Sequence, residues 1–546
     1  MPCVNYFSPL GKFLFCSADN SLFFLIFAFN MARECSRAPC ELLMSRNRDS
    51  ISPKNNYSRV IKYLGIFGGA QGVSFLLSMV RNKFASVLLG AVGFGIIAVY
   101  NRTVQLFCDF TGLSLSLSAV RRMSDAYCNE DEAAVRHCVK VVRSIAVLTG
   151  LAGMLLMLLL SPLMSRFMFD GSWYYAARLA LLSPVVLFIA VSGGELAVLR
   201  GVKQPGKIAM YTLWTAVSAV LATIPLYYAF GLGGILPAIL LVSFFQMAGA
   251  LYFSTRLYAY RAAPFSWQLL REGLDIVKLG AGYIYASILV SGSIWLIYQA
   301  VTRIGGDEAT GIFSAGYILV GMLPSILFAA FDSDYYPNLS GIFAHTRERN
   351  ALVNEHIEVH LLVQVPVMLC VIILLPWLFP LFYSDAFLPA LEMTQIAVFA
   401  LLFHIMTYPI SFMPVSKGDT LVFAGQETIY NVSFVLLTVL GFYRYGWVGA
   451  GVGMALARVI DLCVVYTISR VRYGFRLSSK AVGYFLFSFA VCAAVLFSVL
   501  FAECWPWLRY VGFAVAALSV GVSLNMLSCH SNVFTALYKR IFKKRV

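Results

Sequence analysis

Long apolar runs separated by short polar segments dominate this sequence of 546 residues. Each run is about 20 residues long, the length that carries an α-helix across the hydrocarbon core of a bilayer. Because lipid offers no partner to a backbone hydrogen-bonding group, each run predicts a transmembrane helix. The predicted fold is an all-α polytopic membrane protein with fourteen helices, near residues 62–81, 94–120, 139–160, 177–200, 208–229, 233–256, 278–302, 311–336, 359–382, 390–414, 421–442, 447–469, 481–502 and 507–528.

The first twelve predicted helices divide into two copies of one six-helix unit. Similar residues recur in order at a separation of 215 or 216 positions: Lys62 and Lys278, Gly90 and Gly306, Gly95 and Gly311, Met123-Ser124 and Leu339-Ser340, and Gly231 and Gly446. Many transporters consist of two such copies, with the substrate held between them. The repeat therefore predicts transport.

The repeat also predicts the domain organisation. Residues 1–45 do not fit the pattern, so we expect them to be a leader upstream of the working protein's start, at Met31 or Met44. The predicted domains are an N-terminal segment (1–57), an N-lobe with helices 1 to 6 (58–257), a cytoplasmic linker (258–277), a C-lobe with helices 7 to 12 (278–470), two extra helices (471–530) and a basic cytoplasmic tail (531–546).

Composition and charge agree with a membrane protein. Hydrophobic residues make up 60% of the chain and charged residues 12%, against roughly 25% charged residues in soluble domains. The net charge of +15 is carried by short loops, for example by Arg136, Lys140 and Arg143. No basic face with stacking aromatic residues stands outside the helices, which argues against nucleic-acid binding. The loops after even-numbered helices are the basic ones, so the positive-inside rule predicts that both termini are cytoplasmic.

The chain lacks the motifs of an enzyme or a metal protein. Its twelve cysteines form no C-x-x-C pair and no zinc-ligand spacing with histidine, so we expect no metal, no cofactor and no catalytic residue. The glycines at 449, 451 and 453 lie within an apolar run, which favours helix packing over dinucleotide binding. A membrane glycan polymerase or ligase would need a large outside loop, and the predicted outside loops are short.

Charged residues within the predicted helices are the candidates for function, because a charge at the centre of a bilayer costs about 2.5–3.5 kcal/mol on insertion scales. Arg102 and Asp109 lie on one face of the second helix, seven residues apart. Arg458 and Asp461 lie three residues apart in the twelfth, a spacing that also allows a purely structural ion pair. Either pair could bind substrate or lock helices together.

Four titratable side chains are candidates for coupling transport to a cation gradient: Asp109, Glu195, His404 and Asp461. A buried carboxyl group can carry a proton, and histidine titrates near physiological pH. The alternative for His404 is a core histidine whose hydrogen bonds are satisfied.

Further cations lie at the ends of predicted helices. Arg81 and Arg303 end the first helix of each copy, and Lys278 begins the seventh. They are either snorkelling anchors or a ring of positive charge that suits an anionic headgroup, for which arginine offers a planar fork of donors.

Several stretches resemble a known family. Lys278-Leu-Gly, Gly311-Ile-Phe-Ser-Ala-Gly-Tyr317, Tyr335-Tyr-Pro-Asn-Leu-Ser340 and the Gly-rich turns before helices six and twelve are similar to the polysaccharide flippases, or O-antigen translocases, of the multidrug/oligosaccharidyl-lipid/polysaccharide exporter superfamily. The resemblance implies two six-helix lobes in a V, alternating access and a lipid-linked oligosaccharide as substrate. It also implies a cationic cavity, with Arg102 at a basic position of relatives. Fourteen helices depart from the twelve of many relatives.

The predicted function is a flippase for an undecaprenyl-diphosphate-linked oligosaccharide in the bacterial inner membrane, as in O-antigen and lipopolysaccharide biosynthesis. The substrate-binding candidates are Arg102, Asp109, Arg81, Lys278, Arg303 and Arg458. Expected partners are the lipid-linked substrate, membrane lipids, H⁺ or Na⁺, and the polysaccharide polymerase machinery. The alternatives are a multidrug/cation antiporter of the same superfamily and a glycan polymerase or ligase.

Overall fold

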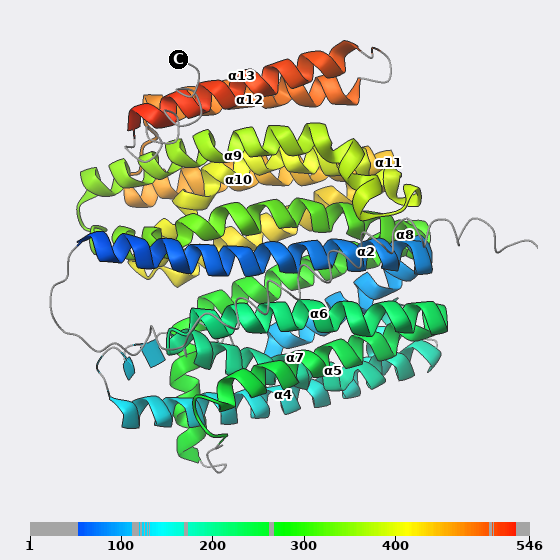
Figure 1. Cartoon of the computed structure of the whole chain (residues 1–546). Helices are drawn as coiled ribbons and strands as arrows, with labels where there is room; N and C mark the ends of the chain where they lie inside the picture. The colour runs from blue at the N-terminus through cyan, green and yellow to red at the C-terminus, as the bar shows by residue number, and fades with distance from the viewer. Residues whose placement is uncertain are drawn as a thin grey trace, which may run out of the picture. The chain divides into compact units, whose positions relative to one another are not determined.

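Helices form all the regular structure of the described residues in this computed structural model. The structure describes residues 53–111, 120, 123–124, 126–127, 129, 131–168, 173–260, 267–501, 505 and 507–530. The predicted leader (1–45) and the predicted basic tail (531–546) therefore lie outside the described residues. The elements are α2 (Pro53–Thr111), α4 (Glu132–Met168), α5 (Trp173–Gly201), α6 (Pro205–Phe230), η2 (Gly231–Gly234), α7 (Ile235–Thr255), α8 (Trp267–Gly341), α9 (Thr346–Phe382), η3 (Asp385–Ala390), α10 (Leu391–Lys417), α11 (Thr420–Tyr473), α12 (Ser479–Leu500) and α13 (Trp507–His530) (Figure 1).

The predicted all-α membrane fold is confirmed. Within the described residues, nine helical segments are long and apolar enough to cross a membrane. Four of them, at 69–111, 205–255, 284–321 and 420–473, are 38 to 54 residues long and each contains two predicted helices. With the shorter apolar helix Tyr510–Ser523, these segments are compatible with fourteen spans.

Glycines of the repeat stand at the breaks between the paired spans. Gly90 breaks α2 with φ 65° and ψ −170°, and Gly306 breaks α8 with φ 77° and ψ −176°. Gly231 (φ 53°, ψ −130°) ends α6, and Gly446 (φ 60°, ψ −137°) breaks α11. Left-handed φ with extended ψ is a backbone conformation that glycine alone adopts readily. The two copies therefore turn their chains in the same way at equivalent positions.

The chain divides into two compact units. Unit 1 comprises residues 1–88 and 110–281, and unit 2 comprises residues 89–109 and 282–546. The part of α2 that follows Gly90 is thus grouped with unit 2, whereas the sequence pattern assigns it to the N-lobe. The predicted lobe boundaries stay a prediction.

Unit 1 is built from α4, α5, α6, α7 and the first half of α2. Helix α5 packs on both α4 and α7, and α7 packs on α6. A core cluster that includes Met123, Val139 and Val198 joins the ends of α4 and α5. Small contacts such as Leu77 with Val220 join α2 to α6.

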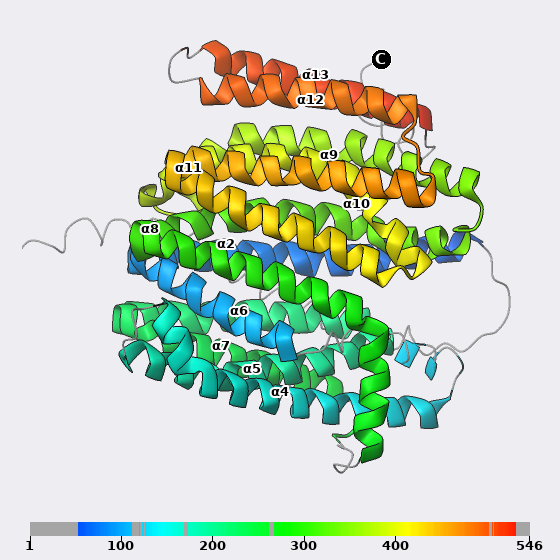
Figure 2. The same ribbon diagram turned by 180° about the vertical axis from the view of Figure 1, so that it is seen from behind.

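Unit 2 contains α9 to α13, most of α8 and the second half of α2. Helix α10 packs on α9 and α11, and α12 and α13 lie side by side against α9 (Figures 1 and 2). Within this unit Gly95 and Gly311 bring two helices into backbone contact. A Cβ on Gly95 would overlap the carbonyl oxygen of Asp307, and one on Gly311 would overlap that of Ala91. Only glycine allows this approach.

Asp419 holds the turn between α10 and α11. Its carboxylate accepts a hydrogen bond of 2.8 Å from the Tyr473 hydroxyl and one of 3.1 Å from Arg472 Nε. These hydrogen bonds, with the nearby positive charges of Arg472 and Lys417, lower the pKa of Asp419 from its ordinary value. The carboxylate therefore stays charged and keeps the end of α11 on this turn.

Candidate functional site

Arg102 lies against tyrosine faces in unit 2. Its guanidinium carbon is 5.8 Å from the ring centre of Tyr298 and 5.9 Å from that of Tyr317. These tyrosines lie on opposite sides of the Gly306 break, so that kink sets the aromatic surroundings of Arg102. Tyr298 is 1% exposed, which fixes one wall of the site. The N–H donors of a guanidinium lie in its plane, so contact between its face and an aromatic ring leaves them directed away from the ring.

Asp109 has polar partners of its own. Gln105 donates a hydrogen bond of 2.9 Å from Nε2 to Asp109 Oδ1, and the Ser291 hydroxyl donates to Oδ2. Trp295, one helical turn after Ser291 in α8, also donates from Nε1 to Thr103 Oγ1 at 3.1 Å. The polar face of α2 is thus fastened to α8, and these contacts give Arg102 and Asp109 different neighbours.

Arg458 forms the centre of a second polar group in unit 2. Its guanidinium carbon lies 4.2 Å from the ring centre of Tyr430. Its Nη1 lies 3.1 Å from His404 Nδ1 and 3.4 Å from Asp461 Oδ2. The side chains of Arg458 and Asp461 are 21% and 12% exposed. Arg458 therefore contacts two of the other residues expected from the sequence, His404 and Asp461.

Aromatic rings connect the two arginines. Tyr317, beside Arg102, lies 6.4 Å from Phe434, and Phe434 stacks on Tyr430 at 5.7 Å with an interplanar angle of 23°. Arg458 in turn lies over the ring of Tyr430. We call this set, from Arg102 through Tyr317, Phe434 and Tyr430 to Arg458, the arginine–tyrosine site. The sequence pattern missed its tyrosines, because nothing separates them from the other tyrosines of the chain until the helices are packed.

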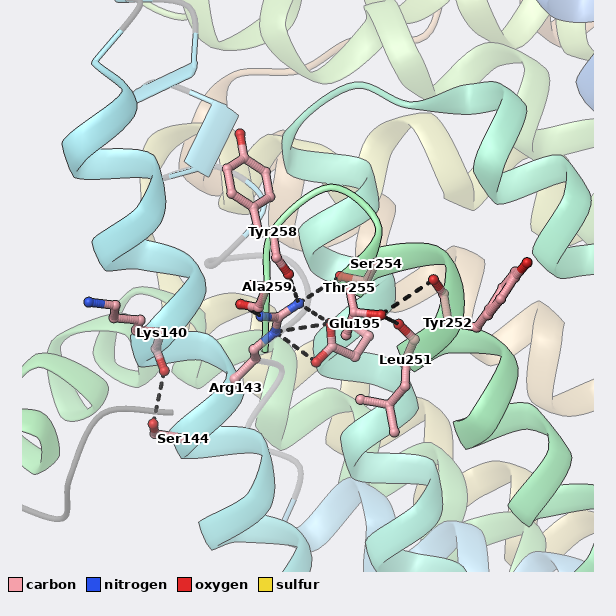
Figure 3. A network of polar contacts seen from close by, with 10 residues as sticks. All are labelled: Lys140, Arg143, Ser144, Glu195, Leu251, Tyr252, Ser254, Thr255, Tyr258 and Ala259. Carbon is pink, nitrogen blue, oxygen red and sulfur yellow. Dashed lines mark hydrogen bonds and ion pairs between the residues drawn. The ribbon is translucent and has the colours of Figure 1, made fainter. Parts of the chain in front are cut away.

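Glu195 lies in a different network, in unit 1. Arg143 Nε donates to its Oε1 at 2.9 Å and Arg143 Nη2 to its Oε2 at 3.0 Å, and both side chains are 1% exposed. The same guanidinium donates to the carbonyls of Ala259 at 2.9 Å and Tyr258 at 3.2 Å and to the Ser254 hydroxyl at 3.2 Å. Figure 3 shows Arg143 pointing from α4 into this ring of acceptors.

The Arg143 network fastens three helices together. Arg143 comes from α4 and Glu195 from α5, while the acceptor carbonyls belong to the segment that follows α7. The sequence pattern counted Arg143 with the basic loop residues. The structure buries it, because the end of α7 and the Glu195 carboxylate supply acceptors to all three nitrogens of the desolvated guanidinium.

The remaining predicted cations are not members of the arginine–tyrosine site. Arg81 lines a pocket in unit 1 together with Ser78 and Gln246. Arg303 is exposed in α8. Lys278 also lies in α8, and its side chain is outside the described part of the structure.

Comparisons with known proteins identify the fold and the family. Residues 61–343, just over half of the chain, match the family described as polysaccharide biosynthesis protein. A comparison with curated proteins finds no match. A solved structure of the lipid II flippase MurJ in an inward closed conformation is 14% identical with a TM-score of 0.62, over 88% of this chain and 99% of that chain.

Two further structures share the fold. An inward-facing multidrug resistance MATE family transporter of the MOP superfamily is 13% identical with a TM-score of 0.59, over 73% of this chain and 94% of that chain. A MOP superfamily transporter from Pyrococcus furiosus is 14% identical with a TM-score of 0.54, over 76% and 94%. With its helical fold and its match over residues 61–343, the chain belongs to the polysaccharide biosynthesis protein family.

Proposed function

We propose that the protein is a flippase that moves an undecaprenyl-diphosphate-linked oligosaccharide, such as an O-antigen unit, across the bacterial inner membrane by alternating access. The observation that carries this proposal is the arginine–tyrosine site within membrane-spanning helices. Two guanidinium groups, each resting on tyrosine faces, offer planar donor forks that match phosphate oxygens. Membership of a polysaccharide biosynthesis family supports a glycan as the cargo.

In this proposal Arg102 and Arg458 bind the diphosphate. Because the surroundings exclude much of the water, each positive charge attracts an anion more strongly than it would in solution. Arg81, Arg303 and Lys278 are proposed to attract the headgroup as it enters or leaves. The polyprenyl tail stays in lipid, since its burial there costs nothing. Both termini are cytoplasmic in this arrangement, and the polymerase machinery receives the product.

A cation gradient, H⁺ or Na⁺, drives the cycle in the same proposal. Asp461 and His404 both contact Arg458. A cation bound at Asp461 would compete with Arg458 for the carboxylate and release the guanidinium for an anionic substrate. Asp109 is the second proposed cation site, where the cation would compete with the hydrogen bonds from Gln105 and Ser291. Glu195 is less suited to this role, because both of its oxygens accept hydrogen bonds from Arg143.

Deletion of the gene tests the proposal. We expect loss of a surface glycan and accumulation of its lipid-linked precursor on the inner leaflet, measured by glycan staining and by accessibility of the precursor to an external probe. Normal surface glycan together with increased drug sensitivity would contradict the flippase and support a multidrug antiporter.

Complementation with variants assigns the role of Arg102. We expect Arg102→Ala to restore little glycan export, because losing a charge-assisted hydrogen bond of about 1.5–3 kcal/mol weakens substrate binding roughly tenfold or more. The matched control is Arg256→Ala, which removes an exposed arginine that lies 4.4 Å from the ring centre of Tyr252 in unit 1. Equal membrane levels of both variants are verified by immunoblot. Full export with Arg102→Ala would leave Arg102 as a packing residue.

A further inference from the structure

A small pocket in unit 1 combines polar and apolar walls. It has a volume of about 170 Å³ and lies between the first half of α2, α6 and α7. Its polar wall is Ser74, Ser78, Arg81, Thr215 and Gln246. Leu77, Ala216, Ala219 and Val220 form the apolar wall. Drug-sized ligands occupy pockets of about 300–1,000 Å³. At about 30 Å³ per water molecule, this pocket has room for one compact polar group.

The repeat explains why the pocket is open. At the separation of 215 residues that relates Gly231 to Gly446, Ala216 and Ala219 correspond to Asn431 and Phe434 of unit 2. Phe434 is a member of the arginine–tyrosine site. Small side chains thus leave a hollow in unit 1 where larger side chains stand in unit 2.

The polar wall follows the same correspondence. Thr215 corresponds to Tyr430, and Gln246 corresponds to Asp461. The positively charged residue does not follow the correspondence. The position in unit 1 that corresponds to Arg458 is Ser243, and the cation that lines the pocket is Arg81 of α2. The pocket is therefore the counterpart in unit 1 of the arginine–tyrosine site, with its own cation.

Two of the three hydroxyl groups that line the pocket are oriented as acceptors. Ser78 Oγ donates to the carbonyl of Ser74 at 2.9 Å, and Thr215 Oγ1 donates to the carbonyl of Thr212 at 2.9 Å. Their oxygen lone pairs are what remains for a ligand, which must then bring hydroxyl donors. Arg81 attracts an anionic group and disfavours a cationic one. A sugar that carries a phosphate or a carboxylate meets both demands.

We propose that this pocket binds one sugar unit with an anionic group and thereby selects the glycan that is moved. The inference rests on the proposed flippase function and adds a specificity site in unit 1 to the arginine–tyrosine site of unit 2. Gln246, whose amide both donates and accepts, lets the pocket bind a hydroxyl in either direction.

Calorimetric titration of the purified full-length protein tests the proposal, with glucose 1-phosphate, glucuronate, glucose and inorganic phosphate as probes. We expect saturable binding of glucose 1-phosphate, glucuronate or both, and the stronger of the two identifies the anionic group. Glucose and inorganic phosphate should bind about tenfold more weakly or worse, because each lacks one half of the recognised chemistry. Equal binding of inorganic phosphate and the sugar acids would overturn the proposal.

Variants locate the binding in this pocket. Arg81→Gln and the isosteric Thr215→Val should weaken binding of the sugar acid roughly tenfold, and Ala219→Phe should abolish it by filling the space. The matched control is Thr223→Val, which removes a hydroxyl of α6 that donates to the Ala219 carbonyl and does not line the pocket. Thermal unfolding verifies that each variant is folded. Unchanged binding in Arg81→Gln and Thr215→Val would overturn the assignment.

Failure of this proposal is distinguishable from failure of the flippase function. If deletion of the gene abolishes the glycan but the purified protein binds no sugar acid, the pocket assignment alone is wrong. If deletion leaves the glycan intact, the flippase function is wrong whatever the pocket binds.

Discussion

At the scale of the residue, buried arginine has two different roles in this protein. Arg143 has a bidentate carboxylate and three further acceptors around it, so its charge is fully used within the protein. Arg102 lies over the rings of two tyrosines and makes a side-chain hydrogen bond with one of them, Tyr298. The number of internal acceptors around a guanidinium thus separates a structural arginine from a candidate binding arginine.

Glu195→Gln should destabilise unit 1 strongly. The substitution leaves the buried Arg143 charge without its counter-charge, and breaking a buried ion pair in this way costs about 3–5 kcal/mol. Thermal unfolding of the purified protein in detergent measures the effect as a lowered midpoint.

The control is Glu132→Gln, which removes the exposed partner of Arg136 at 68% side-chain exposure. We expect this change to lower the unfolding midpoint little or not at all, because water screens the pair. Midpoints that fall equally in the two variants would contradict the structural role of the Arg143 network.

At the scale of the element, the break in a long helix is set by one residue. Gly90 and Gly306 interrupt α2 and α8 with almost the same dihedral angles. No tight loop of several residues is needed, which explains why helices predicted separately from the hydropathy pattern run together. The kink in α8 also places Tyr298 and Tyr317 around Arg102. Helix geometry and candidate site therefore depend on the same glycine.

Gly306→Ala should lower the unfolding midpoint and reduce transport, because a φ of 77° strains any residue with a Cβ by about 1–3 kcal/mol. The control is Gly321→Ala in the same helix, where φ is not positive and nothing lies within 4 Å of an added Cβ. That change should be neutral or stabilise by up to about 1 kcal/mol. Thermal unfolding compares the two, and a larger loss in Gly321→Ala would refute the argument.

The sequence predicted the helices and the repeat more fully than the site. The pairs Gly90 with Gly306 and Gly231 with Gly446 are visible as a constant separation, because backbone geometry of this kind requires glycine. Arg102 and Arg458 are visible because charge is costly in lipid. The contacts of Arg143 are not visible in the sequence, because two of its acceptors are backbone carbonyls, which residues of every type have. Only packing brings the end of α7 to α4.

At the scale of the whole molecule, a doubled scaffold carries unequal chemistry. Unit 1 has the buried Arg143 network and the pocket that Arg81 lines, and unit 2 has the arginine–tyrosine site. The extra helices α12 and α13 pack on α9 within unit 2, and we predict that each crosses the membrane once. The total would then be even, which would place the two ends of the chain on one side of the membrane.

Reporter fusions after residue 546 and within the segment before α2 test this topology. We expect both positions to give the cytoplasmic signal, fluorescence of green fluorescent protein without alkaline phosphatase activity, because basic loops are retained in the cytoplasm. A fusion at residue 503, between α12 and α13, should give the opposite signal. Ends on opposite sides would contradict fourteen crossings.

The contact between Gly95 and Gly311 has an evolutionary consequence. Gly95 faces the carbonyl of Asp307, and Gly311 faces the carbonyl of Ala91. Ala91 and Asp307 are 216 positions apart, like the two glycines themselves, so the two halves of the contact are equivalent. Such a self-complementary contact is the mark of an isologous interface in a twofold dimer. In a dimer of identical halves, every substitution would change both sides of this contact together. In one continuous chain each half can change its side chains separately, so the glycine contact can stay symmetric while the chemistry around it differs.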